Sequence, residues 1–147
     1  MLDMITIKRL LSYKKDDLVE VAETLQANDL SQLIEWLSEK NGKIRYNSFL
    51  LLQHRSKTHN DVYGYMDIFL DKLNSGNSYQ RSIGLMLMAE NAKWDESNKF
   101  DKAIDLYLSF CDDEKSITAR QCIQSLSRVV PHKKHLCTKI AEKLMSI

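Results

Sequence analysis

Apolar residues recur along nearly the whole chain at intervals of three and four, the spacing that places side chains on one face of an α-helix. The pattern first shows in Leu18, Val21, Ala22 and Leu25, and four later segments repeat it. Their apolar positions are Leu30, Leu33, Ile34 and Leu37; Met66, Phe69, Leu70 and Leu73; Ile104, Tyr107, Leu108 and Cys111; and Leu136, Ile140 and Leu144. Four glycines and one proline are few for the turns of a β-sheet protein. We therefore predict an all-α protein of about eight helices joined by short turns.

Polar residues between these segments predict where the helices begin and end. Asp17 with Glu20, and Asp29 with Gln32, have the spacing of a capping box, in which the first residue of the pair caps the helix. Loop-like stretches lie at 41–43 (NGK), 74–78 (NSGNS) and 112–116 (DDEKS). Pro131 fits the first turn of a final helix, where a missing N–H costs nothing.

A shift of 36 residues superimposes one pair of helices on the next. The matches are Leu30, Leu33, Ile34 and Leu37 with Met66, Phe69, Leu70 and Leu73; Arg45 with Arg81; and Phe49, Leu50, Leu51 and Leu52 with Leu85, Met86, Leu87 and Met88. In a third copy the first helix lies 38 residues further on and Arg120 lies 39 beyond Arg81, which suggests one extra residue in the turn. We expect helix-pair repeats at about 29–57, 62–93 and 100–130, with flanking helical segments at 1–26 and 131–146. All of them are expected to form a single domain, 1–147.

The segments at 44–56 and 79–92 are apolar on most sides instead of along one stripe. Such a helix is buried on several sides, as the second helix of a central repeat would be. We therefore expect Leu51 and Leu87 to be shielded from water. The corresponding helix of the third copy has a polar face, as terminal units of repeat arrays do.

An arginine at the start of the second helix of each 36–39-residue pair resembles the HEAT/armadillo class of α-helical repeat proteins. The matching arginines are Arg45, Arg81 and Arg120; the positions six residues before them hold Glu39, Ser75 and Glu114, and those three residues after them hold Ser48, Gly84 and Ile123. The first-helix proline of that family is missing from all three copies. The resemblance implies a right-handed α-α superhelix, a short solenoid. It also implies that the three arginines have a structural role between repeats, although a row of ligand contacts is the alternative.

The net charge is +1, but it is unevenly spread. Residues 1–15 carry +3, residues 16–111 carry −5, and residues 112–147 carry +3. The basic residues near the two ends are Arg128, His132, Lys133, Lys134, Lys139 and Lys143, and Lys8, Arg9, Lys14 and Lys15. A basic groove would suit nucleic acid, as in helical-repeat DNA glycosylases, but the acidic middle disfavours that mode.

Candidate chemistry is sparse. Cys111, Cys122 and Cys137 are an odd number, which favours reduced thiols and a cytoplasmic location over a disulfide framework. His132 and His135 could share a helix face, but no second pair completes a zinc site. We expect no metal or other cofactor, and no catalytic motif is visible. No apolar run approaches the roughly 20 residues that span a bilayer, so no membrane association is expected.

The composite expectation is a non-enzymatic helical-repeat module or scaffold that binds another protein. The candidate partner contacts are Trp94, Arg128, Lys133 and Lys134. The alternative is a nucleic-acid-binding protein or a DNA-repair glycosylase of the helical-repeat type that uses a basic surface. The end helices could also pair between two copies to form a homodimer.

Overall fold

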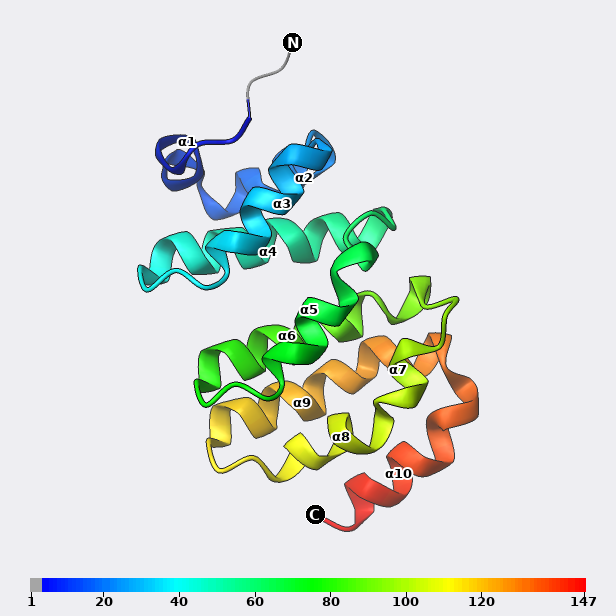
Figure 1. Ribbon diagram of the computed structural model, residues 1–147. Helices are drawn as coiled ribbons and strands as arrows, with labels where there is room; N and C mark the ends of the chain where they lie inside the picture. The colour runs from blue at the N-terminus through cyan, green and yellow to red at the C-terminus, as the bar shows by residue number, and fades with distance from the viewer. Residues whose placement is uncertain (1–3) are drawn as a thin grey trace. The chain divides into compact units, whose positions relative to one another are not determined.

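The computed structural model describes residues 4–147, and every regular element in that range is helical (Figure 1). The prediction of an all-α protein is confirmed. The predicted number of helices, about eight, is too low, because the described residues form ten α-helices and six short 3₁₀ turns. The chain groups into two compact units, Met1–Val62 and Tyr63–Ile147, and each is described by itself.

Unit 1 is built around one long helix. Its α-helices are α1 (Ile7–Ser12), α2 (Leu18–Glu23), α3 (Ala27–Trp36) and α4 (Gly42–Thr58), and the 3₁₀ turn η1 (Lys15–Asp17) precedes α2. α4 packs against α1, α2 and α3, and Leu51 and Leu52 on α4 are fully buried, as expected for Leu51. The side-chain amide of Asn47 donates to the carbonyl oxygen of Leu10 at 3.1 Å, which joins α4 to α1.

Two aspartates act at helix starts in unit 1, but not at the position predicted for them. Asp29 is the third residue of α3, and its Oδ2 accepts from the backbone N–H of Gln26, the residue that caps the helix. Asp17 is likewise the third residue of η1 and accepts from the N–H of Lys14. The prediction that these aspartates are N-caps is therefore wrong by three residues, because the helices begin earlier than the apolar stripe does.

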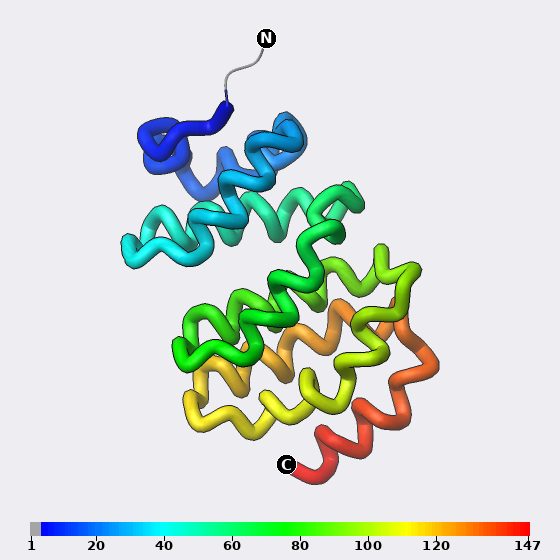
Figure 2. Tube along the Cα trace, in the orientation of Figure 1, coloured from blue at the N-terminus to red at the C-terminus, as the bar shows by residue number. Residues whose placement is uncertain are grey.

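Unit 2 contains two helix pairs and a C-terminal segment. Its α-helices are α5 (Met66–Lys72), α6 (Ser78–Glu90), α7 (Lys99–Lys102), α8 (Ile104–Ser109), α9 (Ser116–Val129) and α10 (Cys137–Met145). Its 3₁₀ turns are η2 (Tyr63–Tyr65), η3 (Ala92–Trp94), η4 (Phe110–Asp112), η5 (Val130–His132) and η6 (Lys134–Leu136). α6 packs against both α5 and α9, and the tube trace shows the two helices of each pair running back past one another (Figure 2). Leu85 and Leu87 on α6 are fully buried, so the apolar stretch of α6 is a helix interior to the unit.

The extra helices arise at two interruptions. Tyr13 and Lys14 have extended backbone, which separates α1 from η1 and α2. Ala103 has ψ near zero, which separates α7 from α8. Pro131 does not open the final helix as predicted; it lies in η5, and α10 begins only at Cys137. The intervening residue Lys133 has a non-helical backbone and a buried side chain, described below.

The second helices of the three pairs fix the true register of the repeat. They begin at Gly42, Ser78 and Ser116, which gives offsets of 36 and 38 residues. The position of Arg45 and Arg81 is therefore occupied by Ala119 in the third pair, and Arg120 lies one place further round the helix. The extra residue inferred for the turn is not needed at this point.

A small residue faces the first helix of every pair. With the same offsets, Ser48, Gly84 and Cys122 are equivalent, in place of the Ile123 suggested by the 39-residue spacing. A Cβ atom on Gly84 would lie only 2.6 Å from the carbonyl oxygen of Phe69 on α5. The Sγ of Cys122 lies 3.3 Å from the carbonyl oxygen of Tyr107, the residue equivalent to Phe69. Close approach of the two helices explains why this position is small.

Candidate functional site

α6 and α9 pack side by side in parallel and in register. Near their starts, the hydroxyls of Ser82 and Thr118 are 3.0 Å apart. Near their ends, Arg128 Nε lies 2.7 Å from Glu90 Oε1. Because matching positions pair at both ends, equivalent residues of the two helices point in the same direction. The face that they share in unit 2 is the candidate site.

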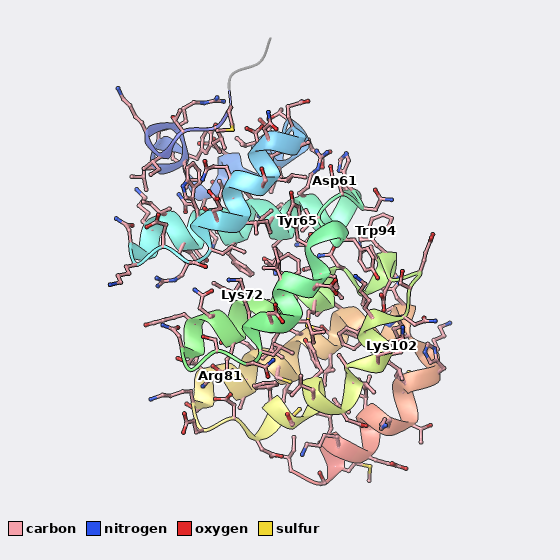
Figure 3. All side chains as sticks on the ribbon, in the orientation of Figure 1. Asp61, Tyr65, Lys72, Arg81, Trp94 and Lys102 are labelled. Carbon is pink, nitrogen blue, oxygen red and sulfur yellow. The ribbon has the colours of Figure 1, made fainter. Side chains whose placement is uncertain are left out.

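The three arginines singled out in the sequence have different surroundings. Arg81, at the start of α6, is buried and forms a two-pronged ion pair with Asp113, 2.8 and 2.9 Å long, while its Nη1 donates to the carbonyl oxygen of Ser75 (Figure 3). This arginine links one helix pair to the turn of the next. Arg45 donates to two carbonyl oxygens of its own turn, those at 39 and 40. Arg120 is exposed on α9, since the helix starts one place later than its predicted role requires.

Most basic residues of the C-terminal segment pair with acids that come earlier in the chain. The pairs are Arg128 with Glu90, Lys133 with Asp95 and Asp101, His135 with Asp101, Lys139 with Asp105, and Lys143 with Asp112. In each pair the two residues are 31 to 38 positions apart, about one repeat. The basic cluster seen in the sequence is therefore largely neutralised within unit 2.

Lys133 is the centre of a buried ionic cluster. Its ammonium group lies 3.0 Å from Asp95 Oδ2 and 2.6 Å from Asp101 Oδ1, and the Lys133 side chain is only 6% exposed. Asp95 also accepts from the Tyr63 hydroxyl and from the backbone N–H groups of Lys99 and Phe100, which fixes the start of α7. As a contact for a partner, Lys133 is out of reach, because it is enclosed by carboxylates of its own chain.

The charges of this cluster hold one another ionised. Burial by itself lowers the pKa of Lys133, but hydrogen bonds to Asp101 and Asp95 outweigh it and the pKa is raised. Burial by itself raises the pKa of Asp95, but hydrogen bonds from Tyr63, Phe100 and Lys133 lower it below the ordinary value. The hydrogen bond to Asp95, together with burial, raises the pKa of the Tyr63 hydroxyl to about 12. No group in the cluster is set to exchange a proton near neutral pH, which fits a structural role and not a catalytic one.

The other candidate contacts are more accessible. Trp94 lies in η3 beyond the end of α6 and is half-buried, with the Lys93 ammonium 5.8 Å from its ring centre. Figure 3 labels Trp94 and Arg81 at opposite ends of α6. Arg128 is 41% exposed although its guanidinium is paired with Glu90, and Lys134 is exposed in η6. These residues are not gathered into one patch with Lys133.

Exposed apolar side chains do gather on α6 and α9. Tyr79 on α6 is 63% exposed and Ile117 on α9 is 50% exposed. They occupy equivalent positions, since 117 is 38 residues after 79, so they lie on the same side of two adjacent helices. Arg120 and Ile123 follow Ile117 on the exposed side of α9. We call these four residues the α6–α9 face.

Sequence reasoning missed Tyr79 and Ile117 because neither belongs to a recurring apolar stripe. A signal was present, however. With the 38-residue offset, an apolar residue outside the buried stripe meets another at the equivalent position, which is unnecessary for packing and therefore informative. The 39-residue offset placed Arg120 opposite Arg81 and concealed this match.

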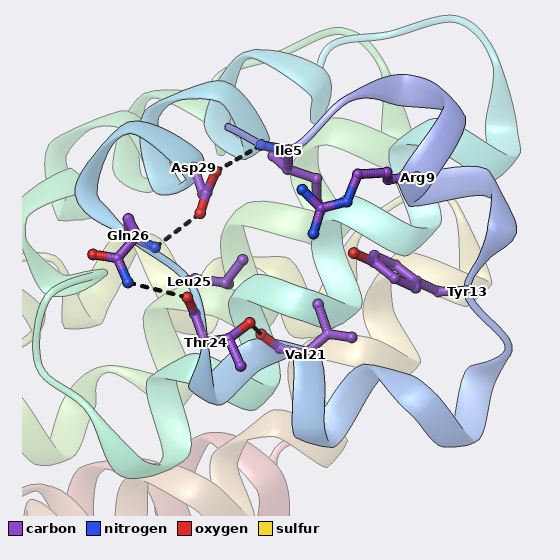
Figure 4. Close-up of a pocket in the computed structure, with 8 residues that line it drawn as sticks. All are labelled: Ile5, Arg9, Tyr13, Val21, Thr24, Leu25, Gln26 and Asp29. Atoms are coloured by element: carbon purple, nitrogen blue, oxygen red, sulfur yellow. Dashed lines mark hydrogen bonds between the residues drawn. The ribbon is translucent and has the colours of Figure 1, made fainter. Parts of the chain in front are cut away.

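Unit 1 has a pocket of about 370 Å³ at its N-terminal end (Figure 4). Ile5, Val21 and Leu25 give it apolar walls, and the Arg9 guanidinium and the Tyr13 hydroxyl point into it. Its one carboxylate, Asp29, already accepts from the N–H groups of Ile5 and Gln26 at 2.8 and 2.9 Å. The pocket holds one cation and one phenol but neither a nucleophile nor a general base, so its chemistry is that of anion binding and not of catalysis.

Among residues 4–147, no group of three or more His, Cys, Asp and Glu side chains could hold a metal ion. His132 and Cys137 take part in no such group, and Cys111 and Cys122 are buried in the core of the third pair, as predicted for these two cysteines. In the described part of the chain, no helix combines the length and the apolar character required to cross a membrane.

Three comparisons with known proteins gave no assignment: no protein-family model, no curated protein and no solved structure matches the chain. The function must therefore be inferred from the geometry of the chain itself.

Proposed function

We propose that this chain is a non-enzymatic helical-repeat protein of the HEAT/armadillo-like kind that binds a segment of another protein on the α6–α9 face. The observation that supports this most directly is the pairing of Tyr79 and Ile117 at equivalent, exposed positions of two adjacent parallel helices. Large side chains at the centre of an interface provide most of its binding free energy. Two of them side by side offer an apolar anchor point.

The chemistry of the partner follows from the charge on the same face. Arg120 lies between Ile117 and Ile123 on the exposed side of α9, because residues three apart are neighbours on a helix. A complementary segment would present apolar side chains next to a carboxylate. The partner we propose is therefore a short amphipathic, acidic segment of another protein.

Nucleic-acid binding is the second candidate, and ion pairing within unit 2 weighs against it. A protein that binds phosphates must offer cations that are free to displace counterions. Five basic residues of the C-terminal segment, Arg128, Lys133, His135, Lys139 and Lys143, already have acidic partners. We expect no binding of a fluorescent 20-base single strand or duplex at 0.15 M salt, measured by anisotropy. Binding in the micromolar range that weakens steeply with added salt would favour the nucleic-acid candidate.

The experiment that tests the proposal is site-specific photo-crosslinking in the native cell. A photoreactive phenylalanine replaces Tyr79 or, in a second variant, Ile117. The matched control replaces Ile68 on α5, which is also exposed (41%) but does not belong to the α6–α9 face. We expect one shared crosslinked protein from positions 79 and 117 that is absent at position 68.

The substitution Arg120→Glu should abolish that crosslink, because it opposes an acidic partner. The same product from position 68, or no shared product from 79 and 117, would contradict the proposal. A product of twice the chain mass would identify a second copy as the partner and would replace the proposal by self-association, which light scattering would then confirm.

A further inference from the structure

The third helix pair contains two thiols in direct contact. Cys111 lies in η4 and Cys122 lies in α9, and both side chains are buried. Their Sγ atoms are 3.7 Å apart, a distance at which two sulfur atoms touch without a bond. No third cysteine competes at this point, since Cys137 is a separate, half-buried residue at the start of α10.

The position of the pair in the repeat shows what the two thiols replace. With the 38-residue offset, Cys111 and Cys122 correspond to Leu73 and Gly84 of the second pair. A Cβ on Gly84 would lie 3.1 Å from Leu73 Cδ2, so these two positions touch there as well. The third pair thus keeps a core contact between the helices but makes it from two oxidisable groups.

We propose that Cys111 and Cys122 are an oxidative modification site, which a peroxide converts into a disulfide that joins η4 to α9. A disulfide needs an S–S distance of about 2.05 Å, so each sulfur must move by roughly 0.8 Å. Movement of this size is within reach of side-chain rotation and small backbone adjustment. The bond would close a short loop from 111 to 122 without unfolding the pair.

The chemical balance needs one peroxide molecule per disulfide. The Cys111 thiolate attacks one peroxide oxygen, the O–O bond breaks, and Cys111 becomes a sulfenic acid while the other oxygen leaves as water. The Cys122 sulfur then attacks the sulfenic sulfur, the S–O bond breaks, and a second water leaves with the thiol proton. Two thiols are oxidised by two electrons in total, and the peroxide is reduced to two waters.

Cys111 is assigned the first step because it is nearer to solvent. It is 4% exposed and Cys122 is fully buried. Burial raises the pKa of both thiols, and it does so more strongly for Cys122. Because the thiolate is the reactive form, oxidation should be slow and should require local opening of η4.

The test uses the full chain with Cys137→Ser, which removes the third thiol. The protein is treated with hydrogen peroxide, quenched with an alkylating reagent and analysed by intact mass and by tryptic peptides. Trypsin separates the three positions into the peptides 103–115, 121–128 and 135–139. We expect the loss of two hydrogen masses and a crosslinked product of peptides 103–115 and 121–128 that dithiothreitol releases.

A second measurement follows the thermal unfolding midpoint by circular dichroism. Oxidation should raise it, because the closed loop restricts the unfolded chain, and dithiothreitol should reverse the rise. The matched control is Cys122→Ser, which places at this position the residue that the first pair has at 48 and which should therefore fold. Its midpoint should not rise with peroxide.

Some results would overturn the proposal. Peroxide might add oxygen mass to Cys111 without any crosslinked peptide, which would show that the second thiol does not reach the first. Equal reactivity of the pair in folded and urea-unfolded protein would show that the folded geometry does not direct the reaction.

Discussion

At the scale of single residues, Gly84 is the point of closest approach between two helices. A glycine inside a helix costs about 1 kcal/mol relative to alanine, so Gly84→Ala would stabilise an exposed helix. Here the added Cβ meets the carbonyl oxygen of Phe69 at 2.6 Å, and backbone cannot move aside as a flexible side chain can. We expect Gly84→Ala to lower the free energy of unfolding by about 1–3 kcal/mol, measured by urea denaturation.

Gly76→Ala is the matched control for this substitution. Nothing lies within 4 Å of a Cβ built on Gly76, so its effect should stay within about 0.5 kcal/mol. A Gly84→Ala protein as stable as this control would show that α5 and α6 are not held as closely as described.

Asp113 makes the stability of unit 2 depend on acidity. The hydrogen bonds from Arg81 lower the pKa of Asp113 below its ordinary value of 3.8. A lowered carboxyl pKa in the folded state gives stability that is fully present above the unfolded value and is lost as the pH falls through the folded value. We expect the free energy of unfolding to fall as the pH drops below about 4, and Asp113→Asn to flatten part of that fall.

The matched control for the pH series is Asp105→Asn. Its carboxylate is 81% exposed, so the substitution should leave the slope of stability against pH unchanged. Identical slopes for Asp113→Asn and the original chain would show that the Arg81 pair contributes nothing to this acid dependence.

At the scale of elements, Lys133 holds the start of α7 to the segment before α10. Removing one partner from a buried ionic cluster leaves uncompensated charge, which costs about 3–5 kcal/mol. We expect a loss of this size for Lys133→Met, since Asp95 is fully buried and Asp101 largely so. Lys139→Met is the control on α10, because its pair with Asp105 is exposed and contributes at most about 1 kcal/mol. Similar losses in urea denaturation for the two variants would contradict the role of Lys133.

The sequence predicts elements well where one residue type decides the outcome. The apolar stripes located the paired helices, and Asn41 and Asn77, within the predicted loops, cap α4 and α6 through their side chains. The interruption at Ala103 could not be predicted, because it depends on Asp95 accepting from the N–H groups of Lys99 and Phe100. The burial of Lys133 was hidden for the same reason: a lysine looks exposed until two carboxylates from a distant segment surround it.

At the scale of the whole molecule, two compact units imply that each has a core of its own. We expect the fragment 63–147 to unfold cooperatively on heating, followed by circular dichroism, because its ion pairs and its core are made within it. The control fragment 79–147 lacks α5, which covers one side of α6, and should lack a sharp transition. Equal behaviour of the two fragments would argue against the boundary at Val62.

The order of charges along the chain has a consequence for synthesis. In the pairs that join Glu90, Asp95, Asp101, Asp105 and Asp112 to the last helices, the acid always comes first. A ribosome therefore releases an excess of unmatched negative charge before the lysines that neutralise it emerge. The growing chain should repel itself, and stay soluble and open, until its final residues arrive and draw unit 2 together.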